Sequence, residues 1–438
     1  MARSEADKHK KVRFRLYGGW WGKTIVLLLR LAVGGVFIFA GFTKVVDPWG
    51  SIYKFEEYFA IFGLTGYDGM LVFLAFTLAI LETMLGVAVF LGIYRRSAPL
   101  VMMLMMAVML PLTLYIAVTG ALRHCGCFGD ALTLGNWETF WKNVALTAGI
   151  IYLLAYNKKV MNVYSFAVQW IVVLLTVPYL ILIANHGYGD QPLIDFRPYP
   201  VGSVYCDAVD AGSGDDAFTF LYEKDGTVAE FSIDSLPDET WQYVDRVATG
   251  SPDDGVKEWH LSLLDKNHRP ADDAIRTEGE QLMLVFNDLS SVWVSQTYFI
   301  NDIYDYAAAR DVSVIGLTSA TEAEIEEWND LSMAFYELYL ADGDELKALV
   351  RGNPALVYLK DGEIKWKRSL QSITFEDISQ AGTIDRVGDN TNARRRFMWL
   401  TAAYLAAMFL LLIANRTYSL WIWRIRKRKA KLLKKLGS

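Results

Sequence analysis

Residues 123–130 gather the residue types in this chain that could do chemistry, and they read Arg-His-Cys-Gly-Cys-Phe-Gly-Asp. They include Cys125 and Cys127, two of the three cysteines, and His124, one of the five histidines. A thiol reacts as its thiolate, which nearby positive charge favours, and Arg123 and His124 directly precede the first cysteine. This stretch is therefore a candidate for thiol or disulfide chemistry.

Two alternatives stay open for the same stretch. Two cysteines separated by one glycine can form a disulfide, and such a small ring would be strained and easily reduced. A purely structural disulfide turn is the first alternative. Metal binding by His124, Cys125 and Cys127 is the second, although a common zinc site takes a fourth ligand and a wider cysteine spacing. We predict Cys125, Cys127 and His124 as catalytic residues and no metal site.

The composition indicates a membrane protein with a large soluble part. The chain has 438 residues, of which 53% are hydrophobic, and its net charge of -6 argues against nucleic-acid binding. Six segments approach the roughly 20 residues that cross a bilayer as a helix. They are Thr24–Val46, Met70–Ile93, Pro99–Gly120, Glu138–Tyr156, Ser165–Ala184 and Phe397–Asn415. The first is predicted to be an uncleaved anchor, because no small-residue cleavage site follows it.

Basic residues flank alternate ends of these spans, and such residues favour the cytoplasm. They occur before the first span, after the second and fourth, and after the sixth at residues 424–435. Both termini are therefore predicted to be cytoplasmic, with the cysteine stretch and residues 185–396 on the outer face. Arg394, Arg395 and Arg396 oppose this orientation, but the larger cluster after the sixth span outweighs them.

Two charged residues lie inside predicted spans, where an unpaired charge is costly. Arg30 lies in the first span and Glu82 near the middle of the second, which runs antiparallel to it. They are predicted either to pair and hold the bundle together or to form a proton relay or a polar ligand site. The methionine-rich third span is interpreted as flexible core packing. Its methionines are Met102, Met103, Met105, Met106 and Met109.

After the fifth span the chain becomes acidic and rich in turn residues, which marks a domain boundary. Residues 218–222 and 228–233 flank Lys-Asp-Gly and predict a hairpin. From residue 281 onward strands and helices alternate, which predicts a sheet covered by helices. The last part, residues 351–364, resembles the second half of thioredoxin, and by that resemblance Pro354 is predicted to be cis.

A thioredoxin carries its Cys-x-x-Cys motif after the first of these strands. Here that place reads Asn287-Asp288-Leu289-Ser290-Ser291-Val292 and contains no cysteine. The domain is therefore predicted to bind or scaffold a partner and not to exchange disulfides by itself. Cys206 lies far upstream in the sequence, and no role is predicted for it.

The spans and the cysteine stretch together resemble the DoxX-like membrane proteins. Residues 31–44 are similar to the opening of that group, and Glu82 stands where those proteins carry a glutamate in the second span. Cys-Gly-Cys-Phe-Gly, followed by Trp137 and Asn143, resembles the methylamine-utilisation MauE branch. The resemblance implies a four-helix membrane bundle in the bacterial inner membrane that assists processing, transport or disulfide maturation of an extracytoplasmic client. The bundle also looks like quinone-linked disulfide-forming enzymes, which makes quinone a candidate cofactor near Arg30 and Glu82.

The expected architecture is an α-helical membrane bundle fused to an extracytoplasmic α/β thioredoxin-like domain. The leading hypothesis is a membrane protein whose Cys125 and Cys127 exchange electrons with a client protein. The alternatives are a non-enzymatic scaffold with a structural disulfide, and small-molecule binding in the bundle. The expected segments are a cytoplasmic N-terminus (1–23), the four-helix domain (24–156), a fifth span (157–188), a β-containing linker (189–275), the thioredoxin-like domain (276–393), a sixth span (394–416) and a basic tail (417–438).

Overall fold

The structure is a computed structural model that describes residues 20–61, 63–64, 66–122, 126–206, 218–224, 227–232, 241–248, 258–388 and 391–436. The chain forms two compact units. The first, called the membrane unit, comprises Met1–Tyr188, Pro192–Ile194 and Thr391–Ser438. The second, called the sheet unit, comprises Gly189–Gln191 and Asp195–Asn390.

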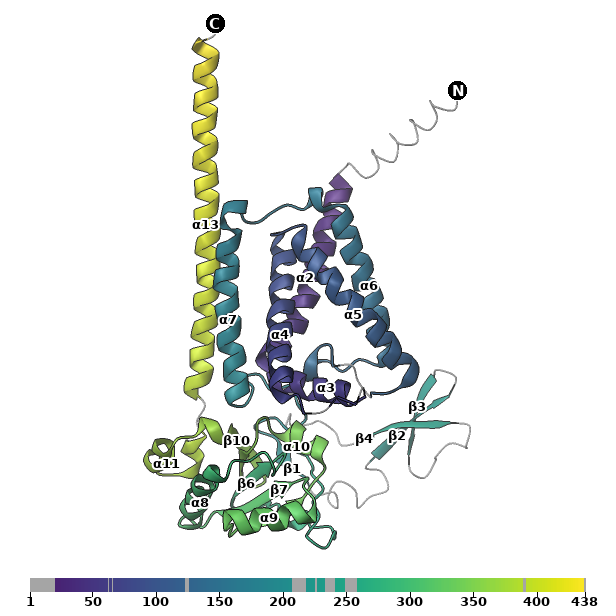
Figure 1. Ribbon diagram of the computed structural model, residues 1–438, viewed down its shortest axis with the longest axis vertical. Coiled ribbons are helices and arrows are strands. Elements are labelled where there is room, and N and C mark those ends of the chain that lie inside the picture. The colour runs from purple at the N-terminus through teal and green to yellow at the C-terminus, as the bar shows by residue number, and fades with distance from the viewer. Residues whose placement is uncertain are drawn as a thin grey trace. The chain divides into compact units, whose positions relative to one another are not determined.

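Long helices make up the described part of the membrane unit (Figure 1). They are α2 (Trp20–Val46), α4 (Asp68–Leu91), α5 (Ser97–Thr119), α6 (Asn136–Ala155), α7 (Gln169–Gly189) and α13 (Thr391–Leu436). A shorter helix, α3 (Pro48–Ile61), follows α2 and was not predicted from the sequence. In the described residues, five helices are long and apolar enough to cross a membrane.

The fourth predicted span forms helix α6 but is not among those five. It is the least apolar of the six, since Glu138, Lys142 and Asn143 lie in its first half. Helix α6 nevertheless packs along α5 and α2, and its residues Ile150 and Leu153 are fully buried in the bundle core. The predicted helical segment is therefore present, while its composition sets it apart from the other spans.

Helices α7 and α13 lie side by side through a row of polar and aromatic contacts (Figure 1). The rings of Tyr179 and Tyr404 stack at 4.3 Å between centroids, and the Tyr179 hydroxyl lies 3.1 Å from Thr401 Oγ1. Ser165 Oγ donates to Asn415 Oδ1 at 2.6 Å. These polar groups thus find their partners between the two helices and the segment just before α7. The predicted sixth span and basic tail form one continuous helix of 46 residues, which is about 69 Å long.

A seven-stranded mixed sheet forms the centre of the sheet unit, in the order β5-β1-β10-β9-β6-β7-β8. Strands β6, β7 and β8 are parallel, and β9 and β10 form an antiparallel hairpin beside β6. The strands are β1 (Val204–Tyr205), β5 (Glu258–Trp259), β6 (Glu280–Phe286), β7 (Ser313–Thr318), β8 (Glu337–Leu340), β9 (Ala355–Lys360) and β10 (Glu363–Ser369). The order β10-β9-β6-β7 and the cis Asn353–Pro354 bond confirm the predicted thioredoxin-like fold.

Strand β6 is buried on both faces, as a central strand between two helical layers requires. Leu282 and Leu284 point into one core with helices α8 (Val294–Ala308), α9 (Glu322–Ser332) and α11 (Phe375–Ala381). Met283 and Val285 point into the other core with helix α10 (Gly343–Leu349). The short helix α12 (Ile384–Val387) adds to the first core.

Two strands of the central sheet come from the region predicted as a linker. Strands β1 and β5 pair with each other, and β1 pairs with β10. The predicted domain boundary at residue 276 therefore falls inside one compact unit. The predicted hairpin is confirmed as β2 (Phe218–Lys224) and β3 (Thr227–Ser232), which form a separate three-stranded sheet with β4 (Gln242–Ala248).

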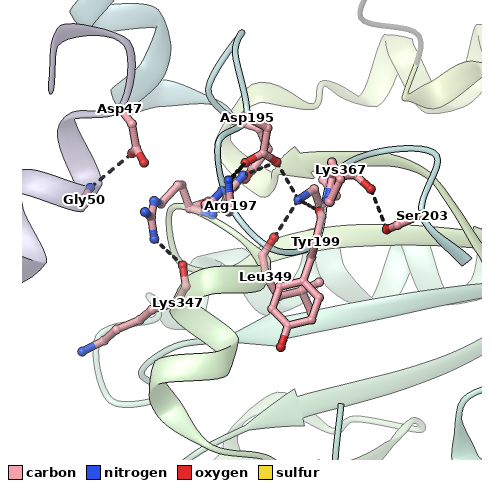
Figure 2. Close-up of polar contacts among 12 residues, drawn as sticks. Asp47, Gly50, Asp195, Arg197, Tyr199, Ser203, Lys347, Leu349 and Lys367 are labelled. Atoms are coloured by element: carbon pink, nitrogen blue, oxygen red, sulfur yellow. Dashed lines mark hydrogen bonds and ion pairs between the residues drawn. The ribbon is translucent and has the colours of Figure 1, made fainter. Parts of the chain in front are cut away.

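A buried charged cluster ties the start of the sheet unit to strand β10 (Figure 2). Asp195 accepts from Arg197 Nε at 2.6 Å and from Lys367 Nζ at 2.8 Å. Lys367 Nζ also donates to the carbonyls of Tyr199 and Leu349, at 2.5 and 3.0 Å. Arg197 and Lys367 are 3% and 5% exposed, and among the described residues Asp195 is the carboxylate that contacts both.

The cluster predicts that the sheet unit gains stability as pH rises. Burial lowers the pKa of Lys367 to about 7 from its ordinary value of 10.5. Between these two pH values the Lys367 side chain is mostly protonated in the unfolded chain and mostly neutral in the folded unit. Stability then rises by up to about 1.4 kcal/mol per pH unit in that window. Hydrogen exchange of β10 amides in the full chain, corrected for intrinsic rates, should show this rise. Lys367→Met should remove it, whereas exchange that is equally pH-dependent in that variant would contradict the assignment.

Candidate functional site

Helices α2 and α4 cross so closely that their contact leaves no room for side chains at certain positions. A Cβ atom on Gly41 would lie 2.4 Å from Thr83 N, and one on Gly86 would lie 2.5 Å from Ile38 N. Residue numbers rise along one helix as they fall along the other, so the pair is antiparallel. This register fixes which polar residues of the two helices meet.

The register places Lys44, not Arg30, beside Glu82. Lys44 Nζ lies 2.6 Å from Glu82 Oε2, and the two side chains are 12% and 13% exposed. Glu82 lies opposite position 42 of α2, which is 12 residues or about 18 Å along the helix from Arg30. Arg30 instead donates to the Met161 carbonyl. The predicted pairing of Arg30 with Glu82 is therefore wrong, while their predicted role in ligand binding stays a prediction.

The Lys44–Glu82 pair lies in the wall of a pocket within the membrane unit, called the inner pocket. The pocket contains about 820 Å³ of space, including its open mouth, and its lining is mostly apolar. Helix α3 contributes Ser51, Lys54 and Tyr58, and α6 contributes Lys142 and Asn143. Met105, Met106 and Met109 of α5 also line it, so the methionine-rich span supplies a pocket wall as well as the predicted core packing.

Part of the cysteine stretch forms a tight turn at this pocket. Gly126 and Gly129 have φ of +66° and +58°, a region that glycine adopts without strain. Gly129 N donates to Gly126 O at 3.0 Å, and Cys127 lies half-buried between them. Arg123, His124 and Cys125 lie outside the described residues, so their predicted roles stay predictions. Among the described residues no group of three or more His, Cys, Asp or Glu side chains could hold a metal ion.

Cys127 lines two pockets at once. Besides the inner pocket, it lines a second space of about 540 Å³, called the outer pocket, which is bounded by residues 126–130 and by Leu132, Thr133 and Thr139. Lys54, Gly126 and Phe128 are also shared by both pockets. Cys127 therefore lies in the part of the loop that borders both spaces.

Two lysine ammonium groups lie near the same loop, and no pattern in the sequence predicts either. The Lys54 stem packs over Gly126, where a Cβ would lie 2.9 Å from Lys54 Cγ, and its Nζ pairs with Glu57 at 2.8 Å. Lys142 Nζ lies 4.2 Å from the centroid of the Phe128 ring. Both lysines are distant from Cys127 in sequence, so only the packing of α3 and α6 reveals them.

Lys54 is expected to favour the thiolate form of Cys127. The substitution Lys54→Met should slow alkylation of Cys127 near neutral pH by about threefold to tenfold, because a neighbouring cation lowers a thiol's pKa. Glu57→Gln is the matched control and should act in the opposite direction, since it frees the Lys54 charge. The rate of iodoacetamide labelling as a function of pH measures both effects, and an unchanged pH profile in both variants would contradict this role.

The thioredoxin-like domain has polar groups where thioredoxins carry their thiols. Asn353, directly before cis-Pro354, donates from Nδ2 to Asp288 O at 2.5 Å and to Ser291 Oγ at 2.7 Å. Asn287 Nδ2 donates to Gly352 O at 2.9 Å. These bonds join the two loops that meet at this end of the sheet, and no thiol is among the groups that form them.

A comparison with protein families concerns the membrane bundle. Residues 22–156 match the family described as methylamine utilisation protein MauE. The predicted resemblance to MauE is thus confirmed for the region that contains α2 to α6 and both pockets. Residues 217–249 match a family described as a domain of unknown function (DUF8463), which covers strands β2 to β4.

Two further comparisons concern whole proteins. None of the curated proteins matches this chain. The chain is similar to the solution structure of a Bacteroides thetaiotaomicron protein described as a candidate protein disulfide isomerase, with 14% identity and a TM-score of 0.24. That match covers 30% of this chain and 89% of the other. The thioredoxin-like fold stated above rests on the strand order and not on this match.

Proposed function

We propose that this protein is a multi-pass protein of the bacterial inner membrane that assists disulfide-linked maturation of an extracytoplasmic client protein. The observation that carries the proposal is the position of Cys127 between the inner and outer pockets. The outer pocket would admit a client cysteine, while the inner pocket would admit an electron acceptor. Both termini would be cytoplasmic, as the basic flanks predict.

The proposed exchange needs one client dithiol and one electron acceptor. A client thiolate attacks the Cys125–Cys127 disulfide and forms a mixed disulfide, which the second client thiol resolves. The client then holds a disulfide, while Cys125 and Cys127 hold two electrons and two protons as thiols. The residues that line the inner pocket would hold a quinone, which would supply the two-electron, two-proton oxidation that restores the Cys125–Cys127 disulfide. Lys44 and Glu82, which line this pocket, would exchange protons with such a molecule.

The thioredoxin-like domain would hold the client rather than oxidise it. Four large side chains on this domain are about three-quarters exposed, namely Trp293, Tyr298, Met333 and Phe335. They belong to adjoining segments, since Asn301 of α8 donates to Ser332 O and the Phe335 ring packs on Tyr304. Exposed apolar clusters of this kind commonly mark interaction sites. MauE proteins are named for methylamine utilisation, but we propose a broader range of clients because this chain carries an added soluble unit.

The test uses the full chain with Cys125→Ser and Cys127→Ser, singly and together. Each single variant should trap a mixed disulfide with a client, and the double variant should leave that client reduced. Alkylation trapping and diagonal gel electrophoresis measure both states. In the unmutated chain, the oxidation state of Cys125 and Cys127 is measured in the same way. If that pair stays permanently oxidised and the single variants form no mixed disulfide, the non-enzymatic scaffold with a structural disulfide is the correct alternative. Glu82→Gln separately tests the acceptor, because it should slow reoxidation without preventing the mixed disulfide.

A further inference from the structure

Residues 287–345 of the sheet unit, which contain α8, α9 and β8, are strongly acidic. They carry thirteen Asp and Glu residues and one basic residue, Arg310, for a net charge of -12. The whole chain carries only -6, so the acidity is concentrated here. Seven of these carboxylates belong to exposed residues of the two helices, namely Asp302, Asp305, Glu322, Glu324, Glu326, Glu327 and Asp330. This part of the sheet unit therefore presents a negatively charged surface.

Large apolar side chains are exposed among the same residues. Trp293, Tyr298, Met333 and Phe335 are 74–77% exposed, and Leu331 is 52% exposed. We call these five residues the apolar patch.

Carboxylates lie directly beside the apolar patch. Residues four positions apart on a helix are neighbours on one face. Asp302 is therefore a neighbour of Tyr298 on α8, and Glu327 is a neighbour of Leu331 on α9. The segment after α9 packs on α8, since the Phe335 ring lies 6.1 Å from the Tyr304 ring. The patch thus combines exposed apolar side chains with negative charge at its rim.

Met333 of the patch has a backbone conformation that favours glycine. It ends α9 with φ of +49° and ψ of +39°, and its N–H donates to Asn329 O at 3.2 Å. Helices commonly end with glycine in this left-handed conformation, because other residues are strained there. Met333 gains no burial in return, since it is 75% exposed. Folding does not explain a methionine here, and a strained, exposed residue of this kind indicates a role at the surface.

The charge decides between two kinds of partner for the apolar patch. Exposed aromatic side chains occur at membrane interfaces as well as at protein interfaces. A membrane surface that contains anionic lipids attracts basic segments, so it would repel the acidic surface around the patch. A positively charged protein segment is attracted instead, because complementary charges steer association and like charges suppress wrong partners.

We infer that the apolar patch binds client segments in which Lys or Arg residues flank large apolar side chains. This inference rests on the docking role proposed above for the thioredoxin-like domain, and it names the chemistry of the client. The apolar side chains would contribute most of the affinity by covering the exposed rings, while Asp302 and Glu327 would pair with the flanking cations. Segments flanked by carboxylates would be rejected, so charge would select among clients.

The test measures how three synthetic peptides bind the full chain in phosphatidylcholine nanodiscs, by fluorescence anisotropy with empty nanodiscs as the blank. The first peptide carries Leu and Tyr flanked by Lys, the second has Glu in place of Lys, and the third has Ser in place of Leu and Tyr. The first should bind about tenfold more tightly than either of the others, and its affinity should fall as salt is added. None of the peptides contains cysteine, so the result does not depend on disulfide exchange.

Variants of the full chain locate the binding surface. Phe335→Ser should weaken binding of the first peptide about tenfold, and Asp302→Lys about threefold or more. Met333→Gly should also weaken binding while keeping or raising thermal stability, because glycine relieves the backbone strain. The matched control is Glu278→Lys, which makes the same charge change at an exposed residue before β6, whereas the patch begins after the end of that strand. It should bind the peptide as the unmutated chain does.

Equal binding of the Lys and Glu peptides, or equal losses in Asp302→Lys and Glu278→Lys, would overturn the inference. Hydrogen exchange of residues 331–336 tests the membrane as the other partner. Protection of these residues in phosphatidylglycerol nanodiscs without peptide, relative to phosphatidylcholine nanodiscs, would identify a membrane contact and also overturn the inference. A chain that binds the first peptide but never traps a mixed disulfide keeps this docking surface and loses the proposed exchange, and the reverse result does the opposite.

Discussion

An Asp195→Ala variant is expected to lose about 3–5 kcal/mol of the stability of the sheet unit, because removing one partner of a buried ion pair leaves an uncompensated charge. Here the loss is compounded, since Asp195 is the carboxylate that contacts both Arg197 and Lys367. Arg197 would then lose its carboxylate partner in a site from which water is largely excluded, and Lys367 would lose the group that favours its protonated form. Denaturation of the full chain in nanodiscs, followed by hydrogen exchange of β10, measures the effect.

The matched control is Glu363→Gln, because Glu363 lies on strand β10 together with Lys367. Glu363 pairs with Lys365 at 2.6 Å, but both side chains are about one-third exposed. A pair of that kind contributes about 0–1 kcal/mol. Equal losses in the two variants would contradict the special role of the buried cluster. The cluster joins the segment that follows α7 to strand β10, so its loss should release that segment before the rest of the sheet unfolds.

Asp195 should give the stability of the sheet unit a second pH dependence, at acid pH. Arg197 and Lys367 hold the pKa of Asp195 well below its usual range, even though burial by itself would raise it. A carboxylate with a lowered folded pKa stabilises the fold above its ordinary pKa, and this contribution is lost as pH falls through the lowered value. The sheet unit should therefore weaken below about pH 4. The Asp195→Ala variant should not show this loss of stability at acid pH.

The second large effect is expected for Gly86→Ala in the membrane unit. A methyl group at this position would lie 2.5 Å from Ile38 N, and the backbone cannot move away without separating α2 from α4. Overpacking of this kind costs about 1–3 kcal/mol and sometimes more. The shift would also part Lys44 from Glu82 and distort the inner pocket. Thermal unfolding in nanodiscs and the rate of Cys127 alkylation measure the two consequences.

Gly35→Ala is the matched control for this prediction. Gly35 lies on the same pair of helices, and a Cβ atom there meets nothing within 4 Å. Alanine is a better helix former than glycine by about 1 kcal/mol, so this variant should be as stable as the original chain or more so. A similar loss of stability in both variants would show that the close crossing of α2 and α4 is not what limits the bundle.

Much of the architecture follows from the sequence by itself. Hydropathy and length determined the membrane helices, because lipid forces each span to satisfy its own backbone as a long apolar helix. Alternating elements and the Asn353–Pro354 pair determined the thioredoxin-like half, and the absent cysteines after β6 determined that it lacks the thiols of thioredoxin. The Cys-Gly-Cys-Phe-Gly sequence, together with the apolar spans, identified the MauE-like region.

The tertiary structure decided which charges meet. Lys44 rather than Arg30 pairs with Glu82, because glycine contacts between α2 and α4 fix a register that hydropathy does not encode. Lys54 and Lys142 reach the residues on either side of Cys127, Gly126 and Phe128, only through the packing of α3 and α6. The buried Asp195 cluster depends on β10 lying beside the segment after α7. Sequence patterns report which face of an element is apolar. Which elements touch, and at what depth, is set by side-chain shape across contacts that are far apart in the chain.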